Sequence, residues 1–193
     1  GGACPNRGCV PSKVWTSVAD VVRTAQEAEG IGVRGPTPTV DLDRVRERTW
    51  SRIESTRDRY LERAGTIDGL EFVNALARFI GDRRLRVGER NVGADIVVLA
   101  NGARPVVPPV EGLEDAGYWT NRNIFDLEEL PGSMLIIGGG YVGCEFAHFL
   151  SAAGACVTLV HRGKRLLERE EPEISRVVEY RLSRHVDIST GTE

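Results

Sequence analysis

A run of glycines at positions 138–143 constrains the fold of this chain more than any other feature. The apolar residues 134–137 precede it, and a helical stretch (144–150) and a second apolar stretch (156–160) follow it. A G-x-G-x-x-G sequence between a strand and a helix is typical of the turn in a parallel βαβ unit that binds a dinucleotide. We therefore expect an α/β fold of the Rossmann type here, with Gly154 ending the helix.

Each of the three motif glycines has its own expected role. Gly138 permits the tight turn, Gly140 lets the backbone approach a pyrophosphate, and Gly143 lets the helix pack closely on the strand. The phosphates would lie at the helix N-terminus, where unbonded N–H groups and the helix dipole favour anions. The sequence thus predicts that these glycines bind a dinucleotide.

A second feature is a pair of cysteines near the start of the chain, Cys4 and Cys9. An ideal helix holds residues i and i+5 too far apart for a disulfide, whose Cα atoms lie about 4.4–6.8 Å apart. Pro5 and Gly8 lie between the two cysteines and distort a helical turn, which allows the pair to close. A disulfide across so small a ring is strained, and strained disulfides are the reducible ones. The spacing therefore predicts a redox-active pair.

Composition excludes several other classes of protein. The chain has 193 residues, is 41% hydrophobic and has a net charge of −3, which is ordinary for a globular protein and gives no reason to expect nucleic-acid binding. No apolar run approaches the roughly 18 residues of a membrane helix. A close cysteine pair in a chain of this kind indicates redox or metal chemistry, and we expect a cytoplasmic protein.

Regular structure is also expected outside the glycine turn. Residues 10–29 and 41–64 show helical periodicity, and the second stretch has a charged, solvated face. Gly30 and Gly32 are expected to end the first helix. Three short strands are then predicted in residues 70–80, 84–87 and 94–100.

The first thirteen residues, GGACPNRGCVPSK, resemble the active-site motif of the pyridine nucleotide–disulfide oxidoreductases, Gly-Gly-x-Cys-x-x-x-Gly-Cys-x-Pro-Ser-Lys. The family includes glutathione reductase, mycothione reductase, dihydrolipoamide dehydrogenase and mercuric reductase. The matching residues are Gly1, Gly2, Cys4, Gly8, Cys9, Pro11, Ser12 and Lys13. The resemblance implies a partial FAD-binding domain in residues 1–112, a crossover in 113–130, and the first part of an NAD(P)-binding domain in 131–193.

A second segment resembles the family's Ala-Thr-Gly-x-x-Pro sequence at the flavin site. Ala100, Gly102 and Pro105 match, whereas Asn101 stands in place of the threonine. Asparagine still forms hydrogen bonds and tolerates turn geometry. The resemblance therefore assigns Gly102 to flavin binding, together with Gly1 and Gly2 of the first motif.

The resemblance also implies a path for electrons and a role for each site residue. NAD(P)H reduces FAD, and the flavin reduces the Cys4–Cys9 disulfide. Cys9 is then the thiol that faces the flavin, and Cys4 attacks an external disulfide. Lys13 pairs with Glu145 beside the flavin, and Tyr141 is the aromatic residue that covers it. The catalytic base of the family is a histidine on the partner subunit, which implies a homodimer.

The resemblance also predicts the substrate and how much of a family member this chain represents. We expect less than half of a typical family member, without the upstream flavin-binding turn and the C-terminal interface domain, and we therefore expect this piece alone to be inactive as a disulfide reductase. The segment TLVHRGKRLL resembles mycothione and glutathione reductases, so a small disulfide of that kind is the expected substrate. Dihydrolipoamide dehydrogenase and mercuric reductase are the alternatives, and a non-catalytic flavin- or nucleotide-binding module is the alternative of another class.

The end of the second strand bears on the choice between NADPH and NADH. NAD-binding members of this fold place an acidic residue there to bind the ribose 2′-hydroxyl. This chain has His161 at that position, followed by Arg162 and Lys164, so it has no carboxylate at that position and two cations that can contact a 2′-phosphate. Gly143 argues mildly for NAD, because NADP-linked members often have alanine there. We expect NADPH, with NADH as the alternative.

The remaining cysteines, histidines and tryptophans are expected to have structural roles. A four-cysteine zinc site would need a second close pair, which the chain lacks, so no metal site is expected. Cys144 and Cys156 are expected to be small buried thiols. His148 and His185 lack the catalytic context of the family, with His185 in a charged tail. The three tryptophans are expected to serve in packing rather than as stacking platforms for a ligand; they are Trp15, Trp50 and Trp119.

Overall fold

Residues 3–66 form a short helix and two long helices, and the two long helices cross each other. The computed structural model describes residues 2–192, so the prediction for Gly1 lies outside the described residues. The helices are α1 (Ala3–Arg7), α2 (Cys9–Ala28) and α3 (Leu42–Thr66), with a 3₁₀ turn, η1 (Glu29–Ile31), after α2. Gly32, with φ of 90°, follows η1, and Asp41 caps α3 by accepting a hydrogen bond from the Arg44 N–H at 3.1 Å. Both predicted long helices are confirmed.

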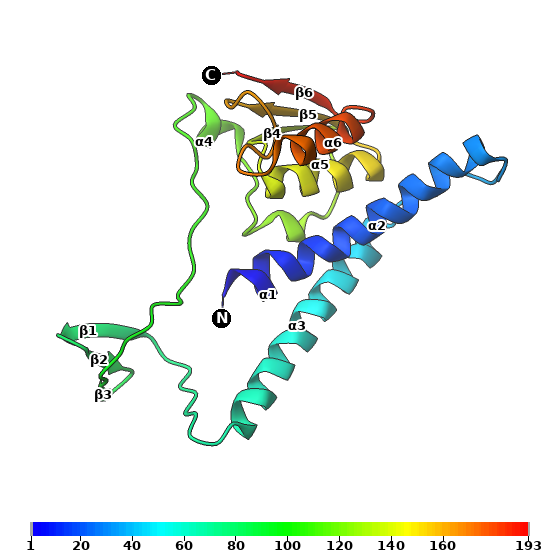
Figure 1. The fold of residues 1–193 in the computed structure, drawn as a ribbon. Coiled ribbons are helices and arrows are strands. Elements are labelled where there is room, and N and C mark those ends of the chain that lie inside the picture. Colours follow the sequence, from blue (N-terminus) through cyan, green and yellow to red (C-terminus); the bar gives the residue numbers. More distant parts are fainter. Residues whose placement is uncertain (1, 193) are drawn as a thin grey trace.

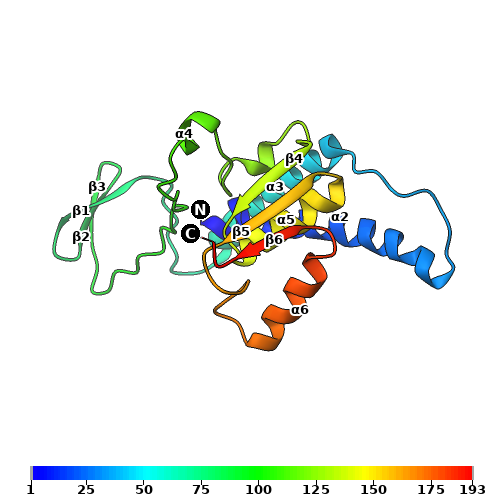
Figure 2. The same cartoon turned by 90° about the horizontal axis from the view of Figure 1, so that it is seen from above.

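The second half forms a three-stranded parallel sheet in the order β4–β5–β6. Its elements are β4 (Ser133–Ile137), α5 (Tyr141–Ala153), β5 (Cys156–His161), α6 (Pro172–Leu182) and β6 (Asp187–Thr190). Ser133 pairs with Cys156, and Thr158 pairs with Asp187. The predicted βαβ unit is confirmed, and α6 and β6 extend it by one further crossover (Figure 2). The stretch around His185, expected to be a charged tail, is the turn between α6 and β6.

Aromatic packing joins the two halves. Figure 1 shows α2 passing beside α5, and Trp15 of α2 is only 2% exposed. The Trp15 ring stacks on Phe149 of α5 with centroids 4.2 Å apart, and meets Phe125 edge-on at 5.0 Å. Phe125 lies in a short 3₁₀ turn, η2 (Ile124–Asp126). The predicted packing role of Trp15 is confirmed, and this contact fixes α2 against the dinucleotide-type unit.

A small antiparallel sheet stands apart from these helices (Figure 1). Its strands are β1 (Ala77–Gly81), β2 (Arg84–Val87) and β3 (Arg90–Gly93), and a short helix, α4 (Leu113–Ala116), follows in the long connection to η2. The predicted strand in residues 84–87 is confirmed, and β1 covers only the end of the predicted strand in 70–80.

The strand predicted in residues 94–100 is wrong. Ile96 and Val98 are each 81% exposed and Leu99 is 71% exposed, and the segment pairs with no other strand in the described part of the chain. An apolar run becomes a strand only where a neighbouring strand supplies hydrogen bonds. The segment is apolar, as predicted, but the described part of the chain supplies no partner strand for it.

No helix in residues 2–192 is long and apolar enough to cross a membrane. The division into residues 1–112, 113–130 and 131–193 stays a prediction, because α2 and α3 pack in the same hydrophobic core as α5 and β5.

Candidate active site

The two motif cysteines lie on either side of a break between two helices. α1 ends at Arg7, Gly8 has φ of −134° and ψ of −117°, and α2 begins at Cys9. A Cβ atom on Gly8 would lie 3.2 Å from the Ala3 carbonyl oxygen and 3.3 Å from the Cys4 Cα. The expected interruption of the helix at Gly8 is confirmed, and it lets α1 fold back close to the start of α2.

Hydrogen bonds hold α1 in this place. The Asn6 side chain donates to the Gly2 carbonyl at 2.8 Å and accepts from the Arg57 guanidinium of α3. Asn121 donates to the Arg7 carbonyl at 3.1 Å. The short helix that contains Cys4 is therefore hydrogen-bonded to α3 and to the segment before η2, although none of its own residues is buried.

Cys4 and Cys9 are both exposed free thiols, the reduced form of the expected pair. A hydrogen bond with the Cys9 side chain raises the pKa of the Cys4 thiol above its ordinary value, and partial desolvation adds to the shift. Cys4 therefore keeps its proton to higher pH than an ordinary cysteine. Since the thiolate is the nucleophile, Cys4 needs a base before it can attack a disulfide.

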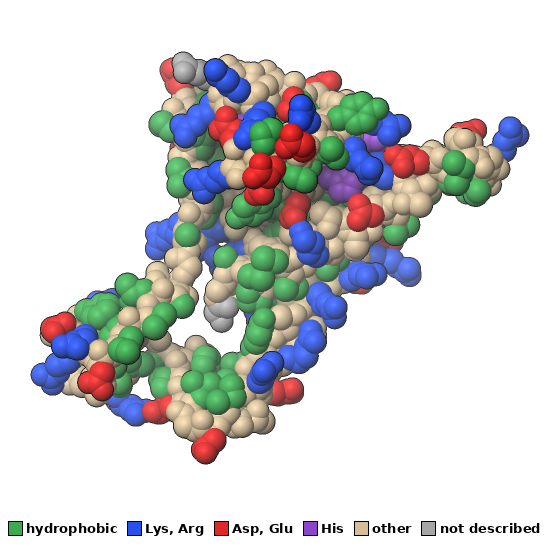
Figure 3. Space-filling view, viewed as in Figure 1, with side chains coloured by type: hydrophobic (Ala, Val, Ile, Leu, Met, Phe, Trp, Pro, Cys, Tyr) green, Lys and Arg blue, Asp and Glu red, His purple; other side chains and the backbone are tan. Residues whose placement is uncertain are grey.

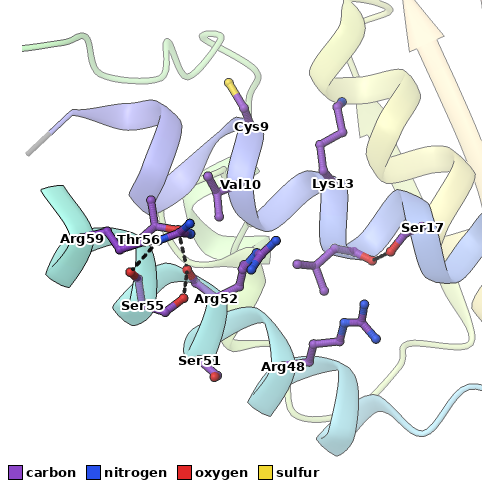
Figure 4. Close-up of a pocket in the computed structure, with 11 residues that line it drawn as sticks. Cys9, Val10, Lys13, Ser17, Arg48, Ser51, Arg52, Ser55, Thr56 and Arg59 are labelled. Carbon is purple, nitrogen blue, oxygen red and sulfur yellow. Dashed lines mark hydrogen bonds between the residues drawn. The ribbon is translucent and has the colours of Figure 1, made fainter.

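Lys13 and Glu145 form a hydrogen-bonded ion pair between α2 and α5, as expected. Lys13 follows Cys9 by one helical turn, and Figure 4 shows the two side chains pointing to the same side of α2. The Lys13 side chain is 63% exposed and that of Glu145 is 24% exposed. The pair connects the helix of the thiol with the helix of the glycine turn.

The glycine turn has the geometry that the motif predicts. Gly138 has φ of 119°, which L-residues rarely adopt. Gly140 is the N-cap of α5, and a Cβ atom there would meet nothing within 4 Å. A Cβ atom on Gly143 would lie 2.0 Å from the Gly138 carbonyl oxygen, so α5 contacts the turn through this glycine. Open space above Gly140 and unbonded N–H groups in the first turn of α5 are what a bound pyrophosphate requires.

Residue Gly139 was not assigned a role from the sequence, and the structure gives it one. A Cβ atom there would lie 2.5 Å from a Leu166 methyl carbon and 2.9 Å from the His161 ring. The Gly139 carbonyl also accepts a hydrogen bond from the Leu167 N–H at 2.8 Å. The loop after β5 thus packs directly on the glycine turn, and a glycine at the variable second position of the G-x-G-x-x-G motif was the signal for this contact.

The strand-end position is His161, as the sequence shows, but the carboxylate of another residue lies beside it. Glu168 folds back so that its Oε1 accepts a hydrogen bond from the Lys164 N–H at 3.0 Å, and its Oε2 lies 4.0 Å from the His161 Nε2. Its carboxylate atoms lie 2.3–2.6 Å from where a Cβ atom on Gly163 would be, so a side chain there would displace Glu168. The carboxylate comes from seven residues beyond His161, and the β5 sequence does not reveal it. Arg162 and Lys164 are exposed and form no ion pair among the residues described.

Three residues that are predicted to bind a cofactor are exposed, and no contact in the structure supports or contradicts that role. Tyr141 is 72% exposed at the start of α5, and Gly102, with φ of 76°, lies in the connection before α4. Gly2 precedes α1. Their assignments to cofactor binding stay predictions.

The other cysteines and histidines are separate from this site. Cys144 is buried as expected, and burial raises the pKa of its thiol to about 11, with the Glu145 charge adding to the shift. Cys156 is exposed at the first position of β5, so its expected burial is wrong. His148 contacts Asp20 at 2.9 Å, and burial lowers the pKa of His185. The described residues contain no group of three or more metal-ligating side chains.

Two alanine substitutions should separate the two functions of the glycine turn. Gly143→Ala places a methyl group against the Gly138 carbonyl and is expected to destabilise the fold by about 1–3 kcal/mol. Gly140→Ala enters open space and should leave the melting temperature unchanged while weakening dinucleotide binding. Thermal denaturation and calorimetric titration with a nicotinamide dinucleotide measure the two effects. Equal melting temperatures for the two variants would contradict the assigned packing role.

Comparison with known proteins agrees with this geometry. The profile of a family described as pyridine nucleotide-disulphide oxidoreductase matches residues 1–193. A mercuric reductase of Staphylococcus aureus is 30% identical over 193 residues, covering 99% of this chain and 35% of that protein. A mercuric reductase of Streptomyces lividans is 35% identical over 186 residues, covering 93% of this chain and 39% of that protein.

Two further relatives extend the comparison. A dihydrolipoyl dehydrogenase of Bacillus subtilis (strain 168) is 26% identical over 206 residues, covering 100% of this chain and 43% of that protein. The Cu(II) complex of the HOCl-induced flavoprotein disulfide reductase RclA from Escherichia coli superimposes with a TM-score of 0.79 at 27% identity, covering 100% of this chain and 41% of that chain. The chain therefore spans less than half the length of these relatives.

Proposed function

The chain belongs to the pyridine nucleotide–disulfide oxidoreductase family, and we propose that its protein moves electrons from a nicotinamide dinucleotide through FAD to a small disulfide. The observation that supports this most directly is the Lys13–Glu145 ion pair. It places an ammonium group one helical turn from Cys9 and joins the thiol helix to the dinucleotide turn. A module that only bound nucleotides would need neither the thiols nor this pair.

The residues present fit both cofactors that the family uses. Gly140 leaves open space at the N-terminus of α5, which suits a pyrophosphate. Cys9 and Lys13 present a thiol and a cation on the same exposed side of α2, which suits a flavin ring. Bound FAD supplies the two-electron transfer between nicotinamide and thiols that amino-acid side chains lack. Lys13 holds positive charge beside the site, and Glu145 fixes the position of that charge.

The two cysteines have separate roles in this proposal. The Cys4 thiolate attacks one sulfur of the substrate disulfide, which forms a mixed disulfide and releases one thiol. Cys9 then attacks the Cys4 sulfur, which releases the second thiol and forms the Cys4–Cys9 disulfide. Because the pKa of Cys4 is raised, a base must accept its proton first. We propose that a partner subunit of a homodimer supplies that base.

Mycothione or glutathione disulfide is the proposed substrate class, and mercuric ion is the second candidate. The mercuric reductases at 30% and 35% identity favour the second candidate, and two adjacent thiolates are suitable ligands for a soft metal ion. Oxidation of NADPH by the full-length, FAD-loaded protein, measured at 340 nm with disulfides or with mercuric ion as acceptor, decides between them. Failure of every acceptor to oxidise NADPH above a Cys4→Ser control would contradict the proposed function.

We further propose that NADPH is preferred over NADH. Arg162 and Lys164 are both available to a 2′-phosphate, whereas Glu168 is a single opposing carboxylate whose Oε1 already accepts the Lys164 N–H. Glu168→Gln should therefore increase the NADPH preference about tenfold, and Arg162→Ala should decrease it by a similar factor, the range of one charged hydrogen bond. The ratio of kcat/KM for the two dinucleotides measures this. An unchanged ratio in both variants would contradict the assignment.

A further inference from the structure

A row of polar contacts follows the line along which α2 packs against α5 and the turn after α6. The Asp20 carboxylate of α2 lies 2.9 Å from the Nε2 atom of His148 on α5. One turn further along α2, the Arg23 guanidinium donates to the Ser151 hydroxyl at 2.8 Å. Figure 3 shows histidine side chains beside acidic and basic ones where α2 passes α5 and α6. These contacts form a polar seam: Asp20–His148, Arg23–Ser151 and Glu27–Arg184.

The polar seam continues the line of the Lys13–Glu145 pair. Asp20 is seven residues beyond Lys13 on α2, and residues at that spacing lie on one face of a helix. His148 is three residues beyond Glu145 on α5 and shares its face in the same way. The α2 side chains of this line alternate in charge: Lys13, Asp20, Arg23 and Glu27. A shift that brought Asp20 opposite Glu145 would place two carboxylates together, so the charge pattern favours the observed register of α2 on α5.

The apolar packing beneath the polar seam holds the two helices together but fixes their register less sharply. Trp15, Ala19 and Val22 of α2 belong to the core that includes α5, and burial of apolar area is non-directional. Hydrogen bonds and ion pairs, in contrast, need a donor and an acceptor at a set distance and angle. The exposed Lys13 ammonium reaches Glu145 on a flexible side chain. Its position therefore depends on the polar contacts that set α2 against α5.

The two histidines near the polar seam have different electrostatic surroundings. The charged and titratable groups around His148 come from three elements: Asp20, Arg23 and Glu27 of α2, Glu145 of α5, and Arg184 and His185 of the turn between α6 and β6. His148 lies within hydrogen-bond distance of a carboxylate, so its protonated form is attracted to Asp20. Burial lowers the pKa of His185, and neighbouring cations add to the shift, so His185 does not supply a second positive charge at neutral pH.

We propose that Asp20 and His148 are positioning residues, whose ion pair sets the register of α2 on α5 and so holds the Lys13 ammonium beside Cys9. The proposal rests on the proposed function for the role of Lys13, and it deepens that function by naming the groups that keep the charge in place. The His148 side chain is 29% exposed and that of Asp20 is 71% exposed. Loss of so exposed a pair should leave the fold intact, which allows its effect on Lys13 to be measured.

Acetylation of Lys13 tests the position of its ammonium group without requiring turnover. The full-length protein is treated with limiting sulfo-N-hydroxysuccinimide acetate, and the acetylated Lys13 peptide is quantified by mass spectrometry against the Lys164 peptide. Lys164 is the only other lysine in residues 1–193 and lies in the loop after β5. A lysine held in an ion pair reacts more slowly than a free one. Asp20→Asn and His148→Gln should therefore each raise the Lys13-to-Lys164 ratio about threefold, the range of one partly exposed ion pair.

Glu173→Gln is the matched control for these two variants. Glu173 lies in the first turn of α6 and pairs with Arg176 at 2.8 Å, outside the polar seam. Its substitution also removes one exposed ion pair and should leave the acetylation ratio unchanged. An unchanged ratio in Asp20→Asn and His148→Gln would overturn the proposal, and so would an equal rise in the control.

The reductive half-reaction separates positioning from general stability. In the full-length holoenzyme, His148→Gln should slow the appearance of the long-wavelength absorbance on mixing with NADPH by about threefold, as measured by stopped flow. In a Lys13→Ala background the same substitution should have no further effect, because no ammonium group remains to be positioned. Equal slowing in both backgrounds would show that His148 acts through general stability and would overturn the proposal.

A permanent cation at position 148 provides both a rescue and a pH signature. His148→Arg keeps a positive group near Asp20 and should restore the rate and the acetylation ratio. The native protein should match His148→Arg at low pH and approach His148→Gln as pH rises and the imidazole loses its proton. A constant ratio between the native rate and the His148→Arg rate from about pH 5.5 to pH 8.5, the range in which histidines titrate, would overturn the proposal.

Failure of this proposal is distinguishable from failure of the proposed function. If NADPH reduces the holoenzyme normally but none of these variants changes the acetylation ratio, the positioning role is wrong and the proposed function stands. If NADPH does not reduce the native holoenzyme at all, the proposed function is contradicted, and the acetylation ratio still decides whether Asp20 and His148 position Lys13.

Discussion

Cys9→Ser is expected to abolish both disulfide turnover and the long-wavelength absorbance of the reduced holoenzyme, whereas Cys4→Ser abolishes turnover and keeps that absorbance. The reason is geometric. Cys9 begins α2 and shares its exposed side with Lys13, which supports the proposed position of the Cys9 thiolate beside the flavin. Cys4 lies across the Gly8 break on α1 and reaches the flavin only through Cys9.

The expected loss of turnover is about three orders of magnitude or more in each variant, because each removes a nucleophile. Spectra from 450 to 700 nm during anaerobic titration with NADPH report the absorbance, and a coupled disulfide assay reports turnover. Cys156→Ser is the matched control, since Cys156 is also exposed but begins β5 outside the site. If Cys4→Ser lost the absorbance and Cys9→Ser kept it, the two roles would be reversed.

The pH dependence of turnover follows from the raised pKa of Cys4. Only the thiolate attacks a disulfide, and the hydrogen bond with Cys9 favours the protonated form of Cys4. The reactive fraction therefore falls as pH decreases through this raised pKa, at a higher pH than for an ordinary cysteine. Loss of the Cys9 partner in Cys9→Ser should move the alkylation pH profile of Cys4 to lower pH, which iodoacetamide labelling measures.

Sequence reasoning predicted the parts of this structure that depend on local pattern. The two long helices have helical periodicity, and the βαβ unit has glycines whose backbone geometry no other residue adopts easily, as Gly138 shows. The Lys13–Glu145 contact was predicted by resemblance, since 132 residues separate the two side chains.

The features that were missed depend on tertiary structure. Whether residues 94–100 form a strand depends on a partner strand, and the position of the Glu168 carboxylate depends on how the loop after β5 folds back on Lys164. A groove between α2 and α3 exists only where the two helices lie against each other, and the helical periodicity of α3 alone indicates a solvated charged face. Each of these properties belongs to a pair of segments rather than to one segment of sequence.

Lys13→Ala is expected to reduce turnover about 100-fold, the range for removal of one preorganised charge from an active site, while lowering the free energy of unfolding by at most about 1 kcal/mol. The small effect on stability follows from the 63% exposure of the Lys13 side chain, since solvent screens an exposed ion pair. If the ion pair only joined α2 to α5, Lys13→Ala would have a large effect on the free energy of unfolding and a small effect on turnover. Denaturant unfolding and stopped-flow reduction by NADPH measure the two quantities.

Two further variants show whether the position of the charge matters. Arg90→Ala breaks the exposed ion pair between Arg90 of β3 and Glu71. It should leave turnover unchanged, and its effect on the free energy of unfolding should be small. The exchange Lys13→Glu/Glu145→Lys keeps an ion pair between α2 and α5 but moves the ammonium group away from Cys9. It should restore the small loss of stability and leave turnover low. Recovery of turnover in the exchanged protein would show that the pair acts by joining the helices, and would contradict the role assigned to Lys13 beside the thiol.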